Sequence, residues 1–435
     1  MRILFTNNTL ADYAGTEIYT RDVALGMQAR GHQPLAFTLE PGRVANELEQ
    51  AGVPVFNDLN AIPNELRPDL IHGHHFFETS LAALAFPKTP VLSFCHGPVA
   101  WQETPCRLPN VVTWITVDHR CRDRLIDEES IPADRIETVF NFIDTDRFQP
   151  RATPLPRRPE KALVFSNTMA DCDALRAAQE ACAQRNLPLD VVGLKAGSAT
   201  DTPESILPQY DLVFAKAKAA IEAMAVGCAV IQLDYFGAGE LITPDSFDRL
   251  RTVNFGYAAM QTPPTADHIG IQIDKYDPAQ AQAVTDRIRN EASIDDALDQ
   301  LEELYRQSVT ADIPSFDPVN AGSDFLRLQS LIARKYLATV KSEDKKSFQL
   351  PPPPLPAHTN LRTYLEDFLS HHQHPEERID EWREKSKQLR ARLDKERQRN
   401  KNLTASLKES QNPPPPKKLS RRLKNLFRSR NTPSS

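Results

Sequence analysis

The stretch that decides the fold is KAKAAIEAMAVGCAVI, residues 216–231. Its first half is rich in Ala and carries Glu222, a composition that predicts a closely packed helix. Gly227 is the stop signal of that helix, and an apolar run over residues 229–233 follows at once as a buried strand. A short helix that turns directly into a buried strand is typical of a parallel sheet covered by helices.

The segment before this stretch repeats the same alternation. Helical patterns separate further apolar runs, and turn residues such as Pro, Gly or Asp bound most of them. We therefore expect a doubly wound α/β domain over residues 156–312. Its other predicted strands are residues 162–165, 189–192 and 212–214.

The first part of the chain predicts a second domain of the same kind over residues 1–155. After its first strand, Tyr19, Val23 and Met27 fall on one face of a helix that stops at Gly31. A segment rich in Pro and Arg, residues 151–161, reads as the connection between the two domains. The strands predicted here are residues 3–5, 34–39, 53–56, 70–72, 91–95, 114–117 and 138–140.

The remaining residues predict additional segments rather than a third domain. An amphipathic helix within residues 313–345 is expected to close the core. The proline-rich segment of residues 346–374 predicts a stiff linker with a short helix. Residues 375–411 keep apolar side chains at most heptad positions, which predicts a coiled coil and self-association. A single solvated helix is the alternative, because three of those positions are polar.

The last segment, residues 412–435, predicts a basic amphipathic tail. It contains seven Lys or Arg and no Asp or Glu, although the whole chain has a net charge of -6. Cations around a leucine stripe over residues 417–430 suit an anionic membrane surface. A solvated tail is the alternative, and nucleic acid is not the expected partner.

The composition narrows the class of protein. A chain of 435 residues with 40% hydrophobic residues can form two ordinary domains with extra segments. No run of about 18 apolar residues occurs, and the N-terminus lacks the apolar core of a secretory signal. The six cysteines are scattered without metal-binding spacing. We expect a cytoplasmic protein, peripheral at the inner face of the cell membrane if the tail binds lipid.

Residues at predicted strand ends are the candidates for chemistry. Gly15 and Thr16 begin a helix, where free N–H groups attract an anion. His96 follows a strand, and a histidine with a pKa near neutrality suits general-base or electrostatic work. A second histidine group, residues 72–75, has unsuitable spacing for a metal, and we expect no metal site there.

Five motifs together resemble the retaining glycosyltransferases with the GT-B fold, family 4 in the usual classification. Residues 216–231 are similar to the donor-sugar element of that family, a run of the type L-E-A-M-A-x-G-x-P-V-V. The resemblance implies an α/β protein with two Rossmann-like domains facing a central cleft, with the helical and coiled-coil tail outside the match. The other motifs are AGTEIYTRDVALGMQARGH (14–32), PDLIHGHH (68–75), VLSFCHGP (91–98) and VFNFIDTDRFQP (139–150).

The resemblance also implies roles for individual residues. Glu222 would contact the ribose of the nucleotide, and His96, the catalytic candidate, would lie near the donor sugar and the acceptor. The turn of Gly15 and Thr16 would approach the diphosphate, and Asn141 of the interdomain motif is a further donor-binding candidate. No bound metal or other cofactor is implied, since the nucleotide sugar is a substrate.

The chain departs from the family pattern at the donor site. Phe214 stands where a second glutamate is usual, and the first strand of the second domain runs into Asn167 instead of the usual Arg and Lys. Asn167 is therefore a donor-binding candidate. Lys216 and Lys218 are the candidates for the missing cationic clamp, with ordinary surface lysines as the alternative.

Three functions remain open from the sequence. The first is transfer of a hexose-type sugar, with retention, from a nucleotide diphosphate donor to a polysaccharide, lipid or other cell-surface acceptor. The second is a catalytically inactive scaffold that acts through its coiled coil. The third is a nucleotide-sugar epimerase of the same two-lobed architecture.

Overall fold

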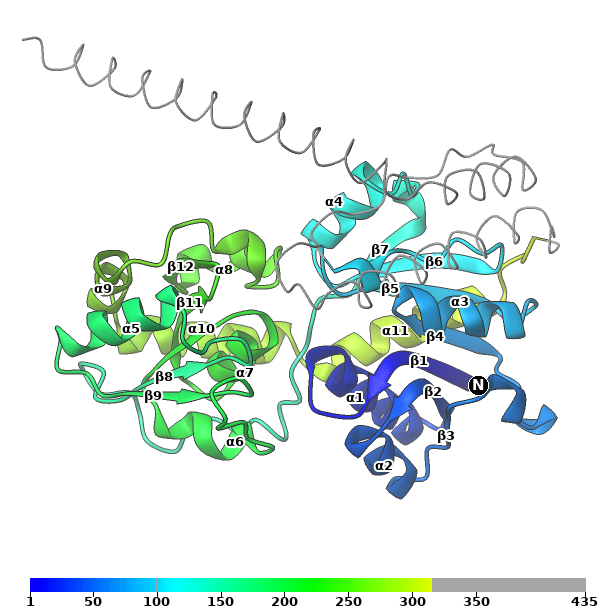
Figure 1. The fold of residues 1–435 in the computed structure, drawn as a ribbon, viewed down its shortest axis with the longest axis horizontal. Coiled ribbons are helices and arrows are strands. Elements are labelled where there is room, and N and C mark those ends of the chain that lie inside the picture. The colour runs from blue at the N-terminus through cyan, green and yellow to red at the C-terminus, as the bar shows by residue number, and fades with distance from the viewer. Residues whose placement is uncertain (99, 315–435) are drawn as a thin grey trace, which may run out of the picture. The chain divides into compact units, whose positions relative to one another are not determined.

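The computed structural model describes residues 1–98 and 100–314. In this part of the chain, two α/β domains each contain one sheet with helices on both faces (Figure 1). The predicted α/β class with two doubly wound domains is confirmed. The predicted segments from residue 315 onward, including the coiled coil and the basic tail, lie outside the described residues.

The first sheet is wholly parallel, and its strands run in the order β3-β2-β1-β4-β5-β6-β7. Helices α1 and α2 cover one face, and α3 and α4 cover the other. The strands are β1 (Arg2–Leu10), β2 (Gln33–Pro41), β3 (Val55–Phe56), β4 (Leu70–His74), β5 (Val91–Cys95), β6 (Val111–Thr116) and β7 (Ile136–Thr138). The helices are α1 (Gly15–Ala29), α2 (Arg43–Gln50), α3 (Phe76–Ala85) and α4 (His119–Asp127).

The second sheet has the order β12-β11-β10-β8-β9, and only the edge strand β12 is antiparallel. Helices α7, α8 and α10 pack on one face, and α5 and α9 pack on the other. The strands are β8 (Ala162–Phe165), β9 (Leu189–Val192), β10 (Leu212–Ala215), β11 (Ala229–Asp234) and β12 (Gly237–Leu241). The helices are α5 (Asp173–Ala183), α6 (Pro203–Ile206), α7 (Ala217–Ala225), α8 (Pro244–Arg251), α9 (Ala266–Asp274) and α10 (Pro278–Glu291).

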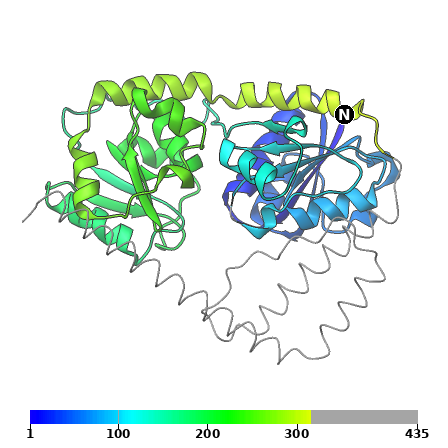
Figure 2. The same cartoon turned by 90° about the horizontal axis from the view of Figure 1, so that it is seen from above.

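Helix α11 (Ile294–Val309) returns to the first domain (Figure 2). It packs against α1 and β4, and its Leu301 and Tyr305 are fully buried in the core beneath them. On sequence grounds this helix falls within the second domain, whose predicted boundary is residue 312. Amphipathic spacing predicts a helix but not which sheet receives its apolar face, so only the structure assigns α11 to the first core.

The strand predictions agree closely with the structure where the apolar runs are continuous. Strands β5, β8 and β9 have the predicted bounds. Strand β12 was not predicted, because GAGEL lacks the apolar run that identifies a buried strand.

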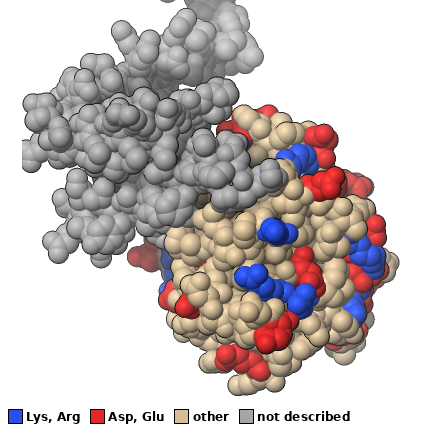
Figure 3. Space-filling view, turned by 90° about the vertical axis from the view of Figure 1, so that its right-hand side faces the viewer, with Lys and Arg blue, Asp and Glu red and all other residues tan. Residues whose placement is uncertain are grey.

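On the molecular face in Figure 3, basic and acidic side chains lie interspersed.

Candidate active site

The carboxyl ends of the parallel strands bring the candidate residues together, as expected for open α/β sheets. In the first domain, His74 ends β4 and His96 directly follows the neighbouring strand β5. The Nδ1 atom of His74 lies 2.6 Å from Nε2 of His96. Two histidines that are 22 residues apart in the sequence therefore form one hydrogen-bonded pair.

The ring of Tyr19, from the second turn of α1, covers this histidine pair. Its centroid lies 5.3 Å from that of His74 and 4.8 Å from that of His96. The ring centroid of Phe142, from the connection between the domains, lies 5.0 Å from that of Tyr19. The strand ends of the first domain are thus walled by rings rather than by charges.

Burial makes these histidines poor proton acceptors. It lowers the pKa of His96 to about 3, with smaller contributions from His75 and Lys218, and it lowers the pKa of His75 to about 4. The pKa of His74 is lowered well below its ordinary value for the same reason. The sequence suggested a pKa near neutrality for His96, whereas its surroundings keep the imidazole neutral across the physiological range.

The loop after His96 is fixed by buried polar contacts. The backbone N–H of His96 donates to the Glu103 carboxyl group at 2.6 Å, and Arg124 donates to the carbonyl oxygen of Gly97 at 2.9 Å. Burial raises the pKa of Glu103 to about 7. His75 adopts a φ of 63°, which is strained for a residue with a side chain, and the N–H of Asn8 donates to its ring at 3.2 Å.

The glycine turn of the first domain is open. Gly15 begins α1, and no atom lies within 4 Å of where its Cβ would stand, while the preceding Ala14 provides no side-chain cap. Thr16 is engaged locally, because its hydroxyl donates to the buried Glu17 carboxyl group at 2.9 Å. The turn has room for a ligand, but its nearest hydroxyl already has a partner.

Glu222 is the most distinctive residue of the second domain. Its side chain lies on α7, is 9% exposed, and makes no hydrogen bond to any described residue. Burial raises its pKa to about 7, although Lys218 and Arg147 both favour the charged form. Its carboxyl oxygens keep contact with solvent, so a bound ligand can reach them.

Lys218 connects the two domains. Its ammonium group lies 3.2 Å from the Asp22 carboxylate of α1 and 5.6 Å from the ring centroid of Phe142. Burial opposes the charge of Asp22, but Lys218 and Arg21 outweigh it and hold the pKa of Asp22 below its ordinary value. Because Lys218 also acts electrostatically on His96 and Glu222, the structure brings three predicted site residues into one neighbourhood.

Lys216 belongs to a separate cluster at the strand ends of the second sheet. Its ammonium group pairs with the fully buried Asp234, and it lies 5.0 Å from the ring centroid of Phe236. Thr168, from the turn after β8, donates its hydroxyl to the same carboxylate at 2.7 Å. Phe214 is fully buried in β10 and offers this cluster no polar atom.

Neither predicted asparagine hydrogen-bonds to a residue of the two groups, although Asn167 directly precedes Thr168. The carbonyl oxygen of Asn141 accepts a hydrogen bond from Arg251 at 2.8 Å. The side chain of Asn167 is exposed and accepts a hydrogen bond from the N–H of Leu194 at 3.1 Å. Both asparagines therefore accept hydrogen bonds from residues that are distant in the chain.

Sequence reasoning missed three residues of this region. Asp234 follows the apolar run of β11 directly, so the strand-end rule could have identified it. Tyr19 was assigned only to the apolar face of a helix, and Asp22 had no sequence signal beyond its charge. Their roles depend on neighbours that are distant in the chain.

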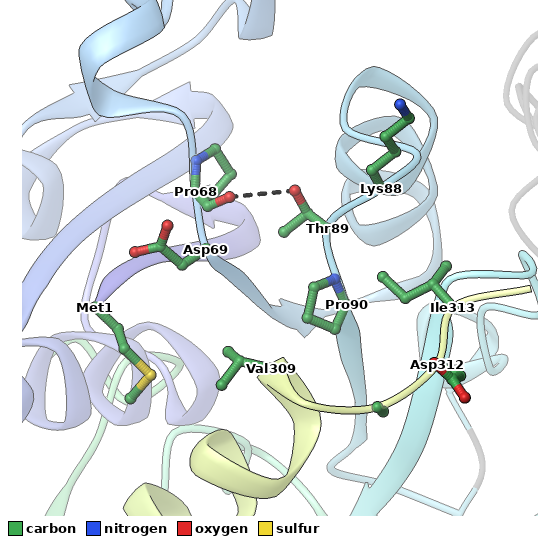
Figure 4. Close-up of a pocket in the computed structure, with 10 residues that line it drawn as sticks. Met1, Pro68, Asp69, Lys88, Thr89, Pro90, Val309, Asp312 and Ile313 are labelled. Carbon is green, nitrogen blue, oxygen red and sulfur yellow. Dashed lines mark hydrogen bonds between the residues drawn. The ribbon is translucent and has the colours of Figure 1, made fainter.

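Neither described cavity lies at the Lys218 neighbourhood. The larger one, about 660 Å³, is at the opposite edge of the first sheet, where β4 and β5 begin (Figure 4). The smaller one, about 320 Å³, lies beside Phe236 and Tyr257. Within residues 1–98 and 100–314, no group of three or more His, Cys, Asp or Glu residues is arranged to hold a metal ion.

Comparison with known proteins shows which family and which folds the chain resembles. Residues 13–147 match the model of the family described as Glycosyltransferase Family 4. The fold is GT-B. A comparison with curated proteins finds no significant sequence match. The predicted resemblance to family 4-like GT-B glycosyltransferases is thus confirmed by the family model and by the folds of solved structures.

Three solved structures illustrate the GT-B likeness. HepE from Anabaena, in complex with UDP and glucose, has a TM-score of 0.54 at 15% identity, covering 70% of this chain and 99% of its own. A glycosyltransferase from Rickettsia africae has a TM-score of 0.52 at 15% identity, covering 71% and 99%. Sucrose-phosphate synthase from Thermosynechococcus elongatus has a TM-score of 0.51 at 14% identity, covering 71% and 99%.

The helices of the described part of the chain are short or polar. None of its helices combines the length and the apolar character needed to cross a bilayer.

Proposed function

We propose that the chain is a glycosyltransferase that moves a sugar from a nucleoside diphosphate donor to a glycan or lipid-linked acceptor. The GT-B fold and the family match of the first domain support the reaction class. The UDP and glucose bound by HepE support a nucleotide sugar as the donor. Retention of configuration at the transferred sugar belongs to the same proposal.

The observation that carries the proposal is the state of Glu222. Its carboxyl group is buried yet makes no hydrogen bond to a described residue, and it lies near the cation Lys218. A carboxylate can accept hydrogen bonds from two neighbouring ribose hydroxyls, which would compensate the cost of its burial. A nucleotide is therefore the ligand that best explains a carboxyl group in this position.

Two lysines supply positive charge for the diphosphate in this proposal. The side chain of Lys218 is 20% exposed and that of Lys216 is 31% exposed, so each keeps part of its surface in solvent beside its carboxylate partner. Cations and helix N-termini can stabilise a leaving diphosphate without a metal ion. Chelation of divalent metals with EDTA is therefore expected to leave donor consumption unchanged, and loss of activity on chelation would refute metal independence.

The acceptor proposal rests on the sequence of the C-terminal segments, which lie outside the described residues. A basic tail over residues 417–430 would hold the enzyme at anionic lipid, near membrane-linked acceptors, and residues 375–411 would allow self-association. Deletion of residues 411–435 is expected to abolish binding to anionic vesicles. Unchanged vesicle binding would remove the membrane from the proposal.

A donor screen with the full-length protein tests the proposed function. Calorimetry with UDP-, GDP- and ADP-sugars should identify one preferred donor, and Glu222→Ala should weaken its binding. The matched control is Glu180→Ala, which removes an exposed glutamate from α5 of the same domain. Release of free sugar or transfer to an acceptor supports the transferase, whereas conversion of the donor to an isomer would identify an epimerase.

One observation favours a second candidate, a scaffold without catalytic activity. Phe214 replaces the usual glutamate with a fully buried ring, and both candidate lysines are already paired with carboxylates. Such a site would bind donors weakly or not at all. Absence of binding to every nucleotide sugar in the same calorimetric screen would favour the scaffold.

A further inference from the structure

The hydrogen bond between His74 and His96 has only one donor, and the surroundings determine which ring supplies it. A neutral imidazole carries one N–H and one bare nitrogen, so the contact of 2.6 Å requires one ring to donate and the other to accept. Burial keeps both rings neutral by lowering both pKa values. Two arrangements of the protons are therefore possible.

The second nitrogen of His74 distinguishes these two arrangements. His74 is fully buried, and its Nε2 atom has no hydrogen-bond partner among the described residues. If His96 donated, His74 would carry its proton on Nε2 as a buried N–H without an acceptor, a rare and costly situation. If His74 donates through Nδ1–H, its Nε2 is only a bare acceptor, which is tolerated more readily.

The favoured arrangement also determines what His96 offers to a ligand. When Nε2 of His96 accepts from His74, its own proton must reside on Nδ1. His96 is only partly buried as a residue, and its Nδ1 atom makes no hydrogen bond to any described residue and is not among the enclosed atoms without a partner. The N–H group on that side of the ring is consequently available to a bound molecule.

We propose that His74 is a positioning residue that holds His96 in the Nδ1–H tautomer, so that His96 presents a hydrogen-bond donor, and not a base, to the substrate. This inference rests on the proposed function, because only a substrate at His96 gives the tautomer a use. A neutral N–H donor suits an oxygen of the sugar, the acceptor or the leaving diphosphate. Lys218, close enough to act on His96 electrostatically, further disfavours a protonated ring.

The tautomer can be measured directly in the full-length protein. Two-bond ¹H–¹⁵N correlation spectra of protein labelled with ¹⁵N-histidine separate Nδ1–H from Nε2–H tautomers, and single histidine substitutions assign the signals. We expect His74 and His96 both to show the Nδ1–H pattern at pH 7. An Nε2–H pattern for His96 would overturn the inference, whether or not the protein transfers sugar.

Two substitutions at His74 separate positioning from packing. The side-chain amide of His74→Asn can donate from nearly the same place as Nδ1–H, whereas His74→Leu cannot donate. We expect His74→Leu to release His96 from the Nδ1–H pattern and to lower kcat about tenfold, the equivalent of about 1.4 kcal/mol, with little change in KM. His74→Asn should restore the Nδ1–H pattern and most of kcat.

The control is His72→Leu, which removes another fully buried imidazole from β4. His72 bonds to Tyr305 and not to His96, so the tautomer of His96 should remain unchanged. An equal loss of the Nδ1–H pattern in His72→Leu would show that packing sets the tautomer and would overturn the role of His74. If the wild-type protein consumes no donor, the proposed function fails, while the spectra still decide the tautomer.

Discussion

The strand ends of the two sheets are built from different chemistry. In the first domain, neutral rings gather at this edge, with His74, His96 and Tyr19 in mutual contact. In the second domain the same edge carries ionic groups, of which the pair of Lys216 and Asp234 is the clearest. The two edges have equivalent places in equivalent folds, yet rings predominate at one and an ion pair at the other.

This difference follows from the cost of burying charge. An isolated charge inside a protein is expensive, so the first domain keeps its buried histidines neutral. In the second domain the buried Asp234 is paired with Lys216, and burial raises the pKa of Glu222 to about 7. Neutral hydrogen-bonded rings fix geometry without attracting ions. Lys216 and Lys218 keep part of their side chains exposed beside their carboxylate partners, which is where the proposed function places the diphosphate. We infer that the first domain orients the reacting groups, while the second binds the charged part of the donor.

Substitution of Glu222 tests donor binding by the second domain and should produce the largest effect. We expect Glu222→Ala to raise the Kd for the preferred nucleotide sugar about 100-fold, because hydrogen bonds to a charged group contribute about 1.5–3 kcal/mol. Titration calorimetry measures the change. A Kd within twofold of the wild-type value would remove Glu222 from the donor site.

Removal of the ion pair between Lys216 and Asp234 should have the next largest effect, a loss of stability. We expect Asp234→Asn to lower the free energy of unfolding by about 2 kcal/mol, since Lys216 loses its partner and Thr168 loses a charged acceptor. Urea denaturation measures this loss. The control Asp248→Asn removes an exposed partner of Arg287 and should cost under about 0.5 kcal/mol. Equal losses in both variants would mean that burial of Asp234 has no special importance.

The buried, neutral histidines of the first domain predict how the free energy of unfolding depends on pH. His72 is fully buried, and its pKa is lowered in the folded protein. Below pH about 6.5 the imidazole of His72 therefore binds a proton only in the unfolded chain, and the folded state loses stability as the pH falls. Between pH 6.5 and 5, His72→Leu should therefore reduce the slope of unfolding free energy against pH by up to about 1.4 kcal/mol per unit.

The acidic groups of the site act in the opposite direction. Glu103 and Glu222 have raised pKa values of about 7, so they favour the folded state increasingly as the pH falls from 7 toward 4.5. They are present in both the wild-type protein and His72→Leu, and the difference between the two slopes therefore isolates His72. Identical slopes in urea denaturation series would contradict a neutral, buried His72.

The smallest expected effect concerns the return of α11 to the first domain. The hydroxyl of Tyr305 lies 2.5 Å from Nδ1 of His72, and we expect Tyr305→Phe to lower the free energy of unfolding by about 1 kcal/mol. Hydrogen exchange should locate the loss in β4 and α1 and leave the second sheet unchanged. The control is Tyr257→Phe, whose side chain is 50% exposed. Protection lost mainly in the second sheet would contradict the placement of α11.

The sequence by itself determined the repeated α/β pattern, most strands and the turns that carry the candidate residues. Continuous apolar runs such as 91–95 and 162–165 identify buried strands because local composition alone sets their preference. The positions of Gly15 and His96 followed from the rule that parallel strands present their carboxyl ends at one edge. Glu222 was singled out by the resemblance of residues 216–231 to the family 4 donor-sugar element. These inferences need only residues that are close together in the chain.

Only the tertiary structure decided which of these residues meet and in what state of charge. The hydrogen bond between His74 and His96, the pairing of Lys218 with Asp22, and the return of α11 all join residues distant in sequence. Burial also changed the chemistry, since it moved the pKa of His96 from its expected range near neutrality to about 3. A pKa reflects the surroundings of a side chain in three dimensions, and local sequence does not contain those surroundings.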